Sequence, residues 1–168
     1  ISQEVEKVVP EIVIESNAGA GANFTDEEYS NAGAEIVFSK EEVYQSDVVV
    51  KIEPPTESEI KLLKKDQQLI SAIQLNTREK KYFKSLLDKN VTSIAIEHIR
   101  DEEGKLPLLR SMSEIAGTSS LLIASEYLSN INTGKGLILG GITGISPTDV
   151  VIIGAGTVGE YACKTAIG

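Results

Sequence analysis

Three glycines near the end of the chain have the spacing of a phosphate-binding loop. They follow the apolar residues 150–153 in the pattern Gly154-x-Gly156-x-x-Gly159. In such a loop the first glycine makes a tight turn, the second lets a pyrophosphate approach the backbone, and the third lets a helix pack on the strand. The N-terminus of that helix adds free N–H groups and a partial positive charge. The motif predicts a strand and a helix that hold a dinucleotide through Gly154, Gly156, Thr157, Val158 and Gly159.

A lysine follows another predicted strand. Lys51 belongs to the run Asp47-Val-Val-Val-Lys-Ile52, which is rich in β-branched residues and stops before two prolines. Side chains at the carboxyl ends of parallel strands face the ligand crevice of open α/β sheets. A cation there can hold a carboxylate and polarise a carbonyl, and desolvation can lower its pKa enough for proton transfer. The alternative is an ordinary surface lysine at a strand exit.

The elements that must position these residues alternate between short apolar runs and capped amphipathic segments. Capping residues predict helices that begin after Thr25, Ser39, Thr56 and Asn76. A strand is predicted before or after each of these helices, over residues 11–15, 35–38, 47–52, 68–73 and 91–96. This alternation predicts an α/β fold whose mostly parallel sheet is covered by helices on both faces.

A longer helix with many small residues is predicted from about Ser111 to Leu128. Its internal Gly117 costs about 1 kcal/mol relative to alanine, so we expect close backbone packing or a nearby ligand there. Residues 130–147 are rich in Gly, Asn and Thr and predict a linker. Residues 1–9 have helical spacing of apolar side chains, and we expect that the chain has lost residues at both ends.

Composition limits the class of protein. The chain has 168 residues, a net charge of −9 and no basic cluster, which argues against a nucleic-acid partner. No apolar run reaches the ~18 residues of a membrane span, so no membrane partner is expected. The single cysteine, Cys163, fits a reducing, cytoplasmic compartment. No metal-ligand spacing occurs, and the only histidine, His98, is interpreted as structural.

Four motifs in order resemble a known family. They are Lys51 at a strand end, Ser111-Met-Ser-Glu-Ile-Ala-Gly117, the glycine-rich residues 134–141 and the loop at residues 151–159. Together with Glu15-Ser-Asn-Ala-Gly-Ala-Gly21 they resemble alanine dehydrogenase and the related NAD-binding alpha subunit of nicotinamide nucleotide transhydrogenase. The resemblance covers nearly the whole chain and is much more specific than the glycine pattern alone.

The resemblance implies a fold, a reaction and a division of the chain. The family has a flavodoxin-like substrate domain and a Rossmann domain, and it interconverts L-alanine with pyruvate and ammonia using NAD. By this comparison residues 1–111 are the substrate domain without its first strand, and residues 112–147 are the connecting helix and linker. Residues 148–168 are then the truncated first βα unit of the NAD domain. A small amino or keto acid, NAD (with NADP left open) and a homo-oligomer are the implied partners.

The resemblance also assigns site residues. Lys51 matches the lysine that binds the substrate carboxylate and carbonyl, and Met112 and Ser113 match positions that line the substrate and nicotinamide side of the cleft. The family's catalytic histidine is replaced by Gln74, which cannot change protonation near neutral pH. The family's carboxylate-clamping arginine falls before Ile1, and its catalytic aspartate falls beyond the last residue.

Gln74 keeps other functions open. A transhydrogenase-type subunit would pass hydride between nucleotides and would need no acid or base for a substrate. A regulatory or scaffolding member would bind nucleotide without turnover. A saccharopine-type dehydrogenase of the same fold is more distant, and it too would normally carry a histidine at this position.

Overall fold

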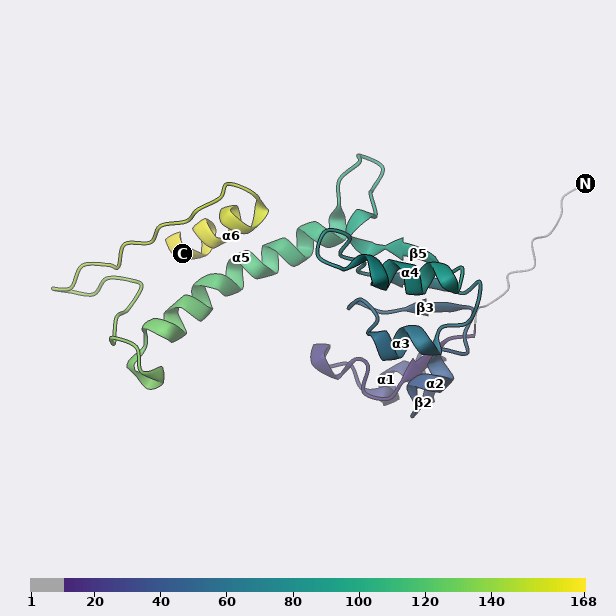
Figure 1. The fold of residues 1–168 in the computed structure, drawn as a ribbon. Helices are drawn as coiled ribbons and strands as arrows, with labels where there is room; N and C mark the ends of the chain where they lie inside the picture. Colours follow the sequence, from purple (N-terminus) through teal and green to yellow (C-terminus); the bar gives the residue numbers. More distant parts are fainter. Residues whose placement is uncertain (1–10) are drawn as a thin grey trace, which may run out of the picture. The chain divides into compact units, whose positions relative to one another are not determined.

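The computed structural model describes residues 11–168, so the helix predicted over residues 1–9 lies outside the described part. The chain divides into two compact units, residues 1–96 and residues 97–168. Every named strand of the described residues belongs to the first unit (Figure 1).

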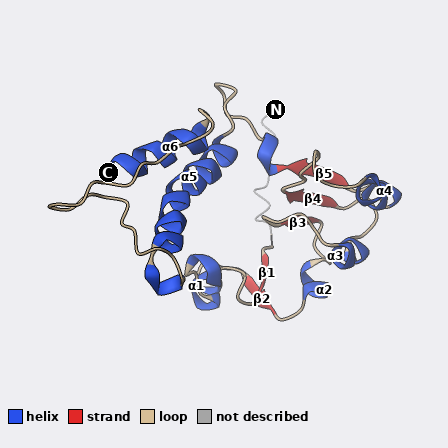
Figure 2. Ribbon diagram, turned by 60° about the vertical axis from the view of Figure 1, so that its left-hand side comes forward, coloured by secondary structure: helices blue, strands red, loops and turns tan. Residues whose placement is uncertain are grey.

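The first unit has the predicted α/β character, with parallel strands throughout (Figure 2). Strand β1 (Val13–Glu15) pairs in parallel with β2 (Glu35–Val37). A separate 3-stranded parallel sheet has the order β3-β4-β5. Its strands are β3 (Val48–Val50), β4 (Gln68–Ser71) and β5 (Thr92–Ala95). The intervening helices are α1 (Asp26–Asn31), α2 (Lys40–Val43), α3 (Glu57–Leu62) and α4 (Lys80–Asp88).

Within the first unit, helices cover one face of the second sheet and not, as predicted, both faces. Val49 and Leu69 pack with Ile60 of α3 and with Tyr82 and Leu86 of α4 in one buried cluster. The opposite face carries exposed apolar side chains, with Val50 at 67% and Ile94 at 41% exposure. The connections β3–α3–β4 and β4–α4–β5 step in the same direction across the sheet. Because such connections are right-handed, their helices lie on the same face.

The predicted helix caps are confirmed in three cases and wrong in one. Thr25 and Thr56 each close a full capping box, and the Ser39 side chain accepts a hydrogen bond from the Glu42 N–H. Asn76 does not cap α4, which begins after Glu79 instead. Residues 74–78 form a turn first, in which the Gln74 carbonyl accepts hydrogen bonds from the N–H groups of Thr77 and Arg78.

The second unit consists of two helices and an irregular connection. Helix α5 (Pro107–Leu128) starts one turn earlier than predicted, because proline suits the first turn of a helix. Ser111 therefore lies inside the helix, where its hydroxyl donates to the Pro107 carbonyl at 3.0 Å. After the short turn η3 (Asn130–Asn132), no helix or named strand forms until α6 (Thr157–Ile167). None of the helices in residues 11–168 is long and apolar enough for a membrane-spanning segment.

The predicted buried strand over residues 150–153 is wrong in this structure. The segment carries no strand assignment, and Val151 and Ile153 are 85% and 97% exposed. A strand exists only by pairing, and the described residues provide no neighbouring strand for this segment. An apolar run predicts a strand from its own residues, but it does not show whether a neighbouring strand is present to pair with it.

Candidate functional site

The glycine loop before α6 forms the predicted turn and helix, without the strand that was predicted before them. Gly154 has φ = +118°, a conformation that side chains rarely adopt, so the turn requires glycine. A Cβ atom on Gly159 would lie 2.1 Å from the Gly154 carbonyl oxygen, so the start of α6 packs directly on the turn. A Cβ atom on Gly156 would meet nothing within 4 Å. Gly154 and Gly159 are therefore required by the fold, whereas Gly156 leaves open space.

The N-terminus of α6 is suited to receive an anion. Gly156 is the N-cap residue, and no side chain makes a capping hydrogen bond there. The first N–H groups of a helix lack partners within the helix and carry a partial positive charge. A phosphate placed in the open space at Gly156 could accept these hydrogen bonds.

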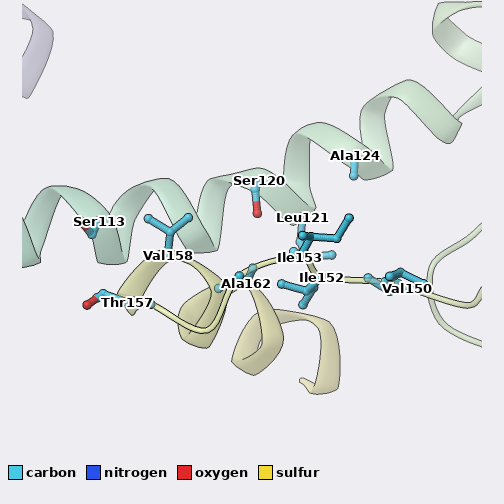
Figure 3. A pocket seen from close by; sticks show the side chains of 14 residues that line it. Ser113, Ser120, Leu121, Ala124, Val150, Ile152, Ile153, Thr157, Val158 and Ala162 are labelled. Atoms are coloured by element: carbon cyan, nitrogen blue, oxygen red, sulfur yellow. The ribbon is translucent and has the colours of Figure 1, made fainter. Parts of the chain in front are cut away.

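A pocket of about 500 Å³ lies between this loop and helix α5 (Figure 3). Ser113, Ser120, Leu121 and Ala124 of α5 form one wall, and the other walls come from residues 150–154 and from the start of α6. The structure thus brings the predicted cleft residue Ser113 into one pocket with the predicted loop residues Gly154, Gly156, Thr157, Val158 and Gly159. Met112 is half-exposed and does not line this pocket.

Lys51 and Gln74, in the other unit, both follow the carboxyl ends of neighbouring parallel strands. The Lys51 N–H donates to the Ile70 carbonyl at 2.9 Å and so extends the pairing of β3 with β4 by one residue. Gln74 lies three residues beyond the end of β4, in a left-handed conformation with φ = +53°. Its side-chain oxygen accepts a long hydrogen bond of 3.5 Å from the Arg78 guanidinium. Register therefore places both residues at the same edge of the sheet, where ligands of α/β folds bind.

The Lys51 ammonium forms an ion pair that the sequence did not reveal. Its Nζ atom lies 2.8 Å from Oε2 of Glu59, a side chain that is only 10% exposed. The same carboxylate accepts the Thr56 N–H at 2.8 Å and contacts the Lys40 ammonium at 3.3 Å. Glu59 thus caps helix α3 and anchors Lys51 at once. The Thr56-x-x-Glu59 pattern predicted the cap, but no spacing rule predicted the pairing with a residue eight positions earlier.

Burial and hydrogen bonding act in opposite directions on the Glu59 carboxyl. Desolvation by burial raises its pKa, but hydrogen bonds from Lys51 and from the Thr56 N–H outweigh that effect and hold the pKa at about 2. Glu59 is therefore ionised at neutral pH, and its negative charge balances the positive charge of Lys51. An ammonium has three N–H donors, and the Glu59 contact uses one of them. Lys51 can hold a second anionic or carbonyl oxygen while it stays paired.

The remaining candidates do not form a second centre. His98 ends the short turn η2 (Ile96–His98), three residues beyond β5. Cys163 is exposed on α6. Within residues 11–168, no three His, Cys, Asp or Glu side chains come together as metal ligands would.

Comparisons with known proteins agree with this arrangement. Residues 3–116 match the profile of the family described as alanine dehydrogenase/PNT, N-terminal domain, and residues 120–168 match the C-terminal domain of the same name. The alanine dehydrogenase of Methanococcus maripaludis is 43% identical over 158 residues, which are 94% of this chain and 42% of that protein. Alanine dehydrogenase 2 of Staphylococcus aureus is 40% identical over 157 residues, with the same coverage of 94% and 42%.

Solved structures give the same result for the fold. An L-alanine dehydrogenase superposes with a TM-score of 0.84 at 37% identity, over 94% of this chain and 43% of that one. A transhydrogenase from Sinorhizobium meliloti superposes with a TM-score of 0.79 at 21% identity, over 94% of this chain and 46% of that one, and shares the fold. The chain spans about two fifths of the length of the curated relatives that it matches. With most of its residues inside the N-terminal family profile, the chain belongs to the alanine dehydrogenase/PNT family.

Proposed function

We propose that the complete polypeptide is an NAD-dependent amino acid dehydrogenase that oxidises L-alanine to pyruvate and ammonia. The observation that carries the proposal is the loop at α6, where Gly156 leaves open space directly before an uncapped helix N-terminus. The relatives named alanine dehydrogenase, at 40% to 43% identity, support this substrate over other amino acids.

The chain's own residues fit a dinucleotide at this loop. A side chain at position 156 would occupy the space that the glycine leaves, and Gly154, Gly156 and Gly159 would let the backbone of the loop hold the pyrophosphate. Ser113 lines the same pocket, and Met112 precedes it on α5. NAD supplies the hydride acceptor when bound. We assign residues 148–168 to the start of the NAD-binding domain, residues 112–147 to the connecting helix and linker, and residues 1–111 to the substrate domain.

Lys51 is the residue that we assign to the substrate. The two ammonium donors that Glu59 does not use can bind the carboxylate and the developing carbonyl of the amino acid. The anchored position of the ammonium lowers the entropy cost of that contact. Gln74, at the same edge, can orient a carbonyl or a water through its amide but cannot transfer a proton.

The glutamine at position 74 favours a second candidate function. Its side chain is a neutral amide hydrogen-bonded to Arg78, at the position where the family resemblance places a histidine. A subunit that passes hydride between nucleotides requires no proton transfer at a substrate, so the transhydrogenase-type function is consistent with glutamine there.

One assay separates the candidates. The complete polypeptide is incubated with NAD and a panel of L-amino acids, alanine first, and NADH formation is followed by absorbance; NADH binding is measured in parallel by fluorescence. Alanine-dependent NADH formation supports the dehydrogenase. Tight NADH binding without oxidation of any amino acid contradicts it and favours the transhydrogenase-type or non-catalytic alternatives.

A further inference from the structure

Helices α5 and α6 of the second unit touch backbone to backbone at Gly117. A Cβ atom on Gly117 would lie 2.4 Å from the carbonyl oxygen of Val158 and 3.0 Å from the backbone N of Ala162. Both neighbours are backbone atoms of α6, so a side chain at position 117 would force the helix to move. Gly117 and Leu121, one turn apart on α5, and Ala162 of α6 are the buried residues of this contact. The sequence left open whether packing or a ligand explains Gly117, and the structure shows packing.

Tyr161 of α6 adds a side chain to the same contact, because its Cβ atom lies 2.8 Å from where a Cβ atom on Gly117 would be. The Lys164 ammonium covers the Tyr161 ring at 4.4 Å from its centroid. On α5, Nε of Arg110 lies 2.8 Å from a carboxylate oxygen of Glu114, so this ion pair joins successive turns of α5.

The positions of these contacts relative to the glycine loop give them a functional meaning. Val158 is the second residue of α6, so the Gly117 contact falls within one turn of Gly156. On α5, Gly117 lies one turn after Ser113. The turn of α5 that follows the cleft residue Ser113 therefore packs directly on the first turn of α6, which follows the phosphate loop.

We propose that Gly117 is a positioning residue, which fixes the phosphate-binding loop beside the part of α5 where Ser113 can contact a dinucleotide bound at the loop. The inference rests on the proposed nucleotide binding and deepens it, because it names a residue outside the glycine loop that sets the cofactor's position. Gly117 does not itself touch the cofactor, and it acts through its close approach to the Val158 carbonyl.

One variant of the complete polypeptide tests the proposal. Gly117→Ala adds one methyl group against the Val158 carbonyl, and Gly140→Ala is the matched control, because a Cβ atom at Gly140 meets open space. NADH affinity is measured by fluorescence, and hydrogen exchange is measured at the amides of residues 154–160. Exchange at the amides of β3, β4 and β5 in the same samples checks that the chain is folded.

We expect Gly117→Ala to weaken NADH binding at least tenfold, with faster exchange of the loop amides and unchanged exchange in the sheet of the first unit. The control should match the parent protein in all readouts. Unchanged affinity and unchanged loop exchange in Gly117→Ala would overturn the proposal. Failure of the parent protein to bind NADH would instead contradict the proposed function, and the loop exchange of Gly117→Ala would still decide whether Gly117 positions the loop.

Discussion

Two lysines bind the Glu59 carboxylate, but only one of them directly follows a strand of the sheet. Lys51 lies 2.8 Å and Lys40 3.3 Å from Glu59, with side-chain exposures of 22% and 52%. Because the proposed substrate role requires a position at the strand end, which Lys40 lacks, replacing the two lysines in turn separates substrate binding from pairing with Glu59.

We expect Lys51→Met in the complete polypeptide to lower kcat/KM for alanine on the order of 100-fold, the effect of removing one preorganised charged donor. Lys40→Met should leave kcat/KM near the parent value. Steady-state kinetics with alanine and NAD provide the measurement. Equal losses in both variants would mean that Lys51 acts only through Glu59 and would remove it from the substrate site.

The low pKa of Glu59 makes a prediction about stability against pH. The carboxyl titrates at about 2 in the folded chain and near its ordinary value of 4.5 when unfolded, so the unfolded state binds more protons in that interval. Ionised Glu59 therefore stabilises the fold fully above its ordinary pKa, and this contribution is lost as the pH falls towards 2. We expect it to be roughly 1–3 kcal/mol, since one partner of the pair is nearly buried.

Urea unfolding of the parent chain and of Glu59→Gln across this pH range measures the contribution. The difference in free energy of unfolding should be largest at neutral pH and should shrink as the pH falls through the interval. Glu57→Gln is the matched control on the same helix, because Glu57 also pairs with a lysine at 2.8 Å but is 72% exposed. A pH-independent difference between parent and Glu59→Gln would show that capping geometry, not charge, explains its role.

At the scale of elements, the two outer glycines of the loop and the middle one should respond differently to the same change. Gly159→Ala places a methyl group 2.1 Å from the Gly154 carbonyl, so α6 must move and the melting temperature should fall. Gly156→Ala meets open space, so the melting temperature should be unchanged while NADH binding weakens at least tenfold, about 1.4 kcal/mol. Calorimetry and NADH fluorescence on both variants provide the comparison. Retained NADH affinity in Gly156→Ala would place the cofactor elsewhere.

The elements also show what the sequence could and could not predict. Thr25, Ser39 and Thr56 were correct as caps because a cap depends on residues within one turn. The prediction that Asn76 caps a helix was wrong because residues 74–78 form a turn before α4 begins. The prediction of a strand over residues 150–153 was wrong because strand pairing depends on a partner far along the chain. In the candidate site, the turn at Gly154 and the start of α6 are local features and were predicted. The pairing of Lys51 with Glu59 and the meeting of Gly117 with Val158 depend on packing and were not.

At the scale of the whole molecule, the buried cluster around Leu69 and the pocket at the glycine loop belong to different units. The core of the first unit centres on Leu69, which is fully buried among Val49, Ile60 and Tyr82, whereas the glycine loop and its pocket are formed entirely within residues 97–168. We expect Leu69→Ala to cost the first unit about 2–5 kcal/mol, the usual effect of a cavity in a packed core. Local opening should then increase in that unit alone.

The measurement combines hydrogen exchange of both units with NADH fluorescence, well below the melting temperature. Protected amides of β3, β4 and β5 should exchange faster in Leu69→Ala, while those of α5 and α6 and the NADH affinity stay at the parent values. Leu121→Ala is the converse variant, because Leu121 is buried on α5 and lines the pocket. It should weaken NADH binding without changing exchange in the sheet. If Leu69→Ala instead lowers NADH affinity as much as Leu121→Ala does, the two units fold as one cooperative body, and the proposed cofactor site depends on the core of the first unit.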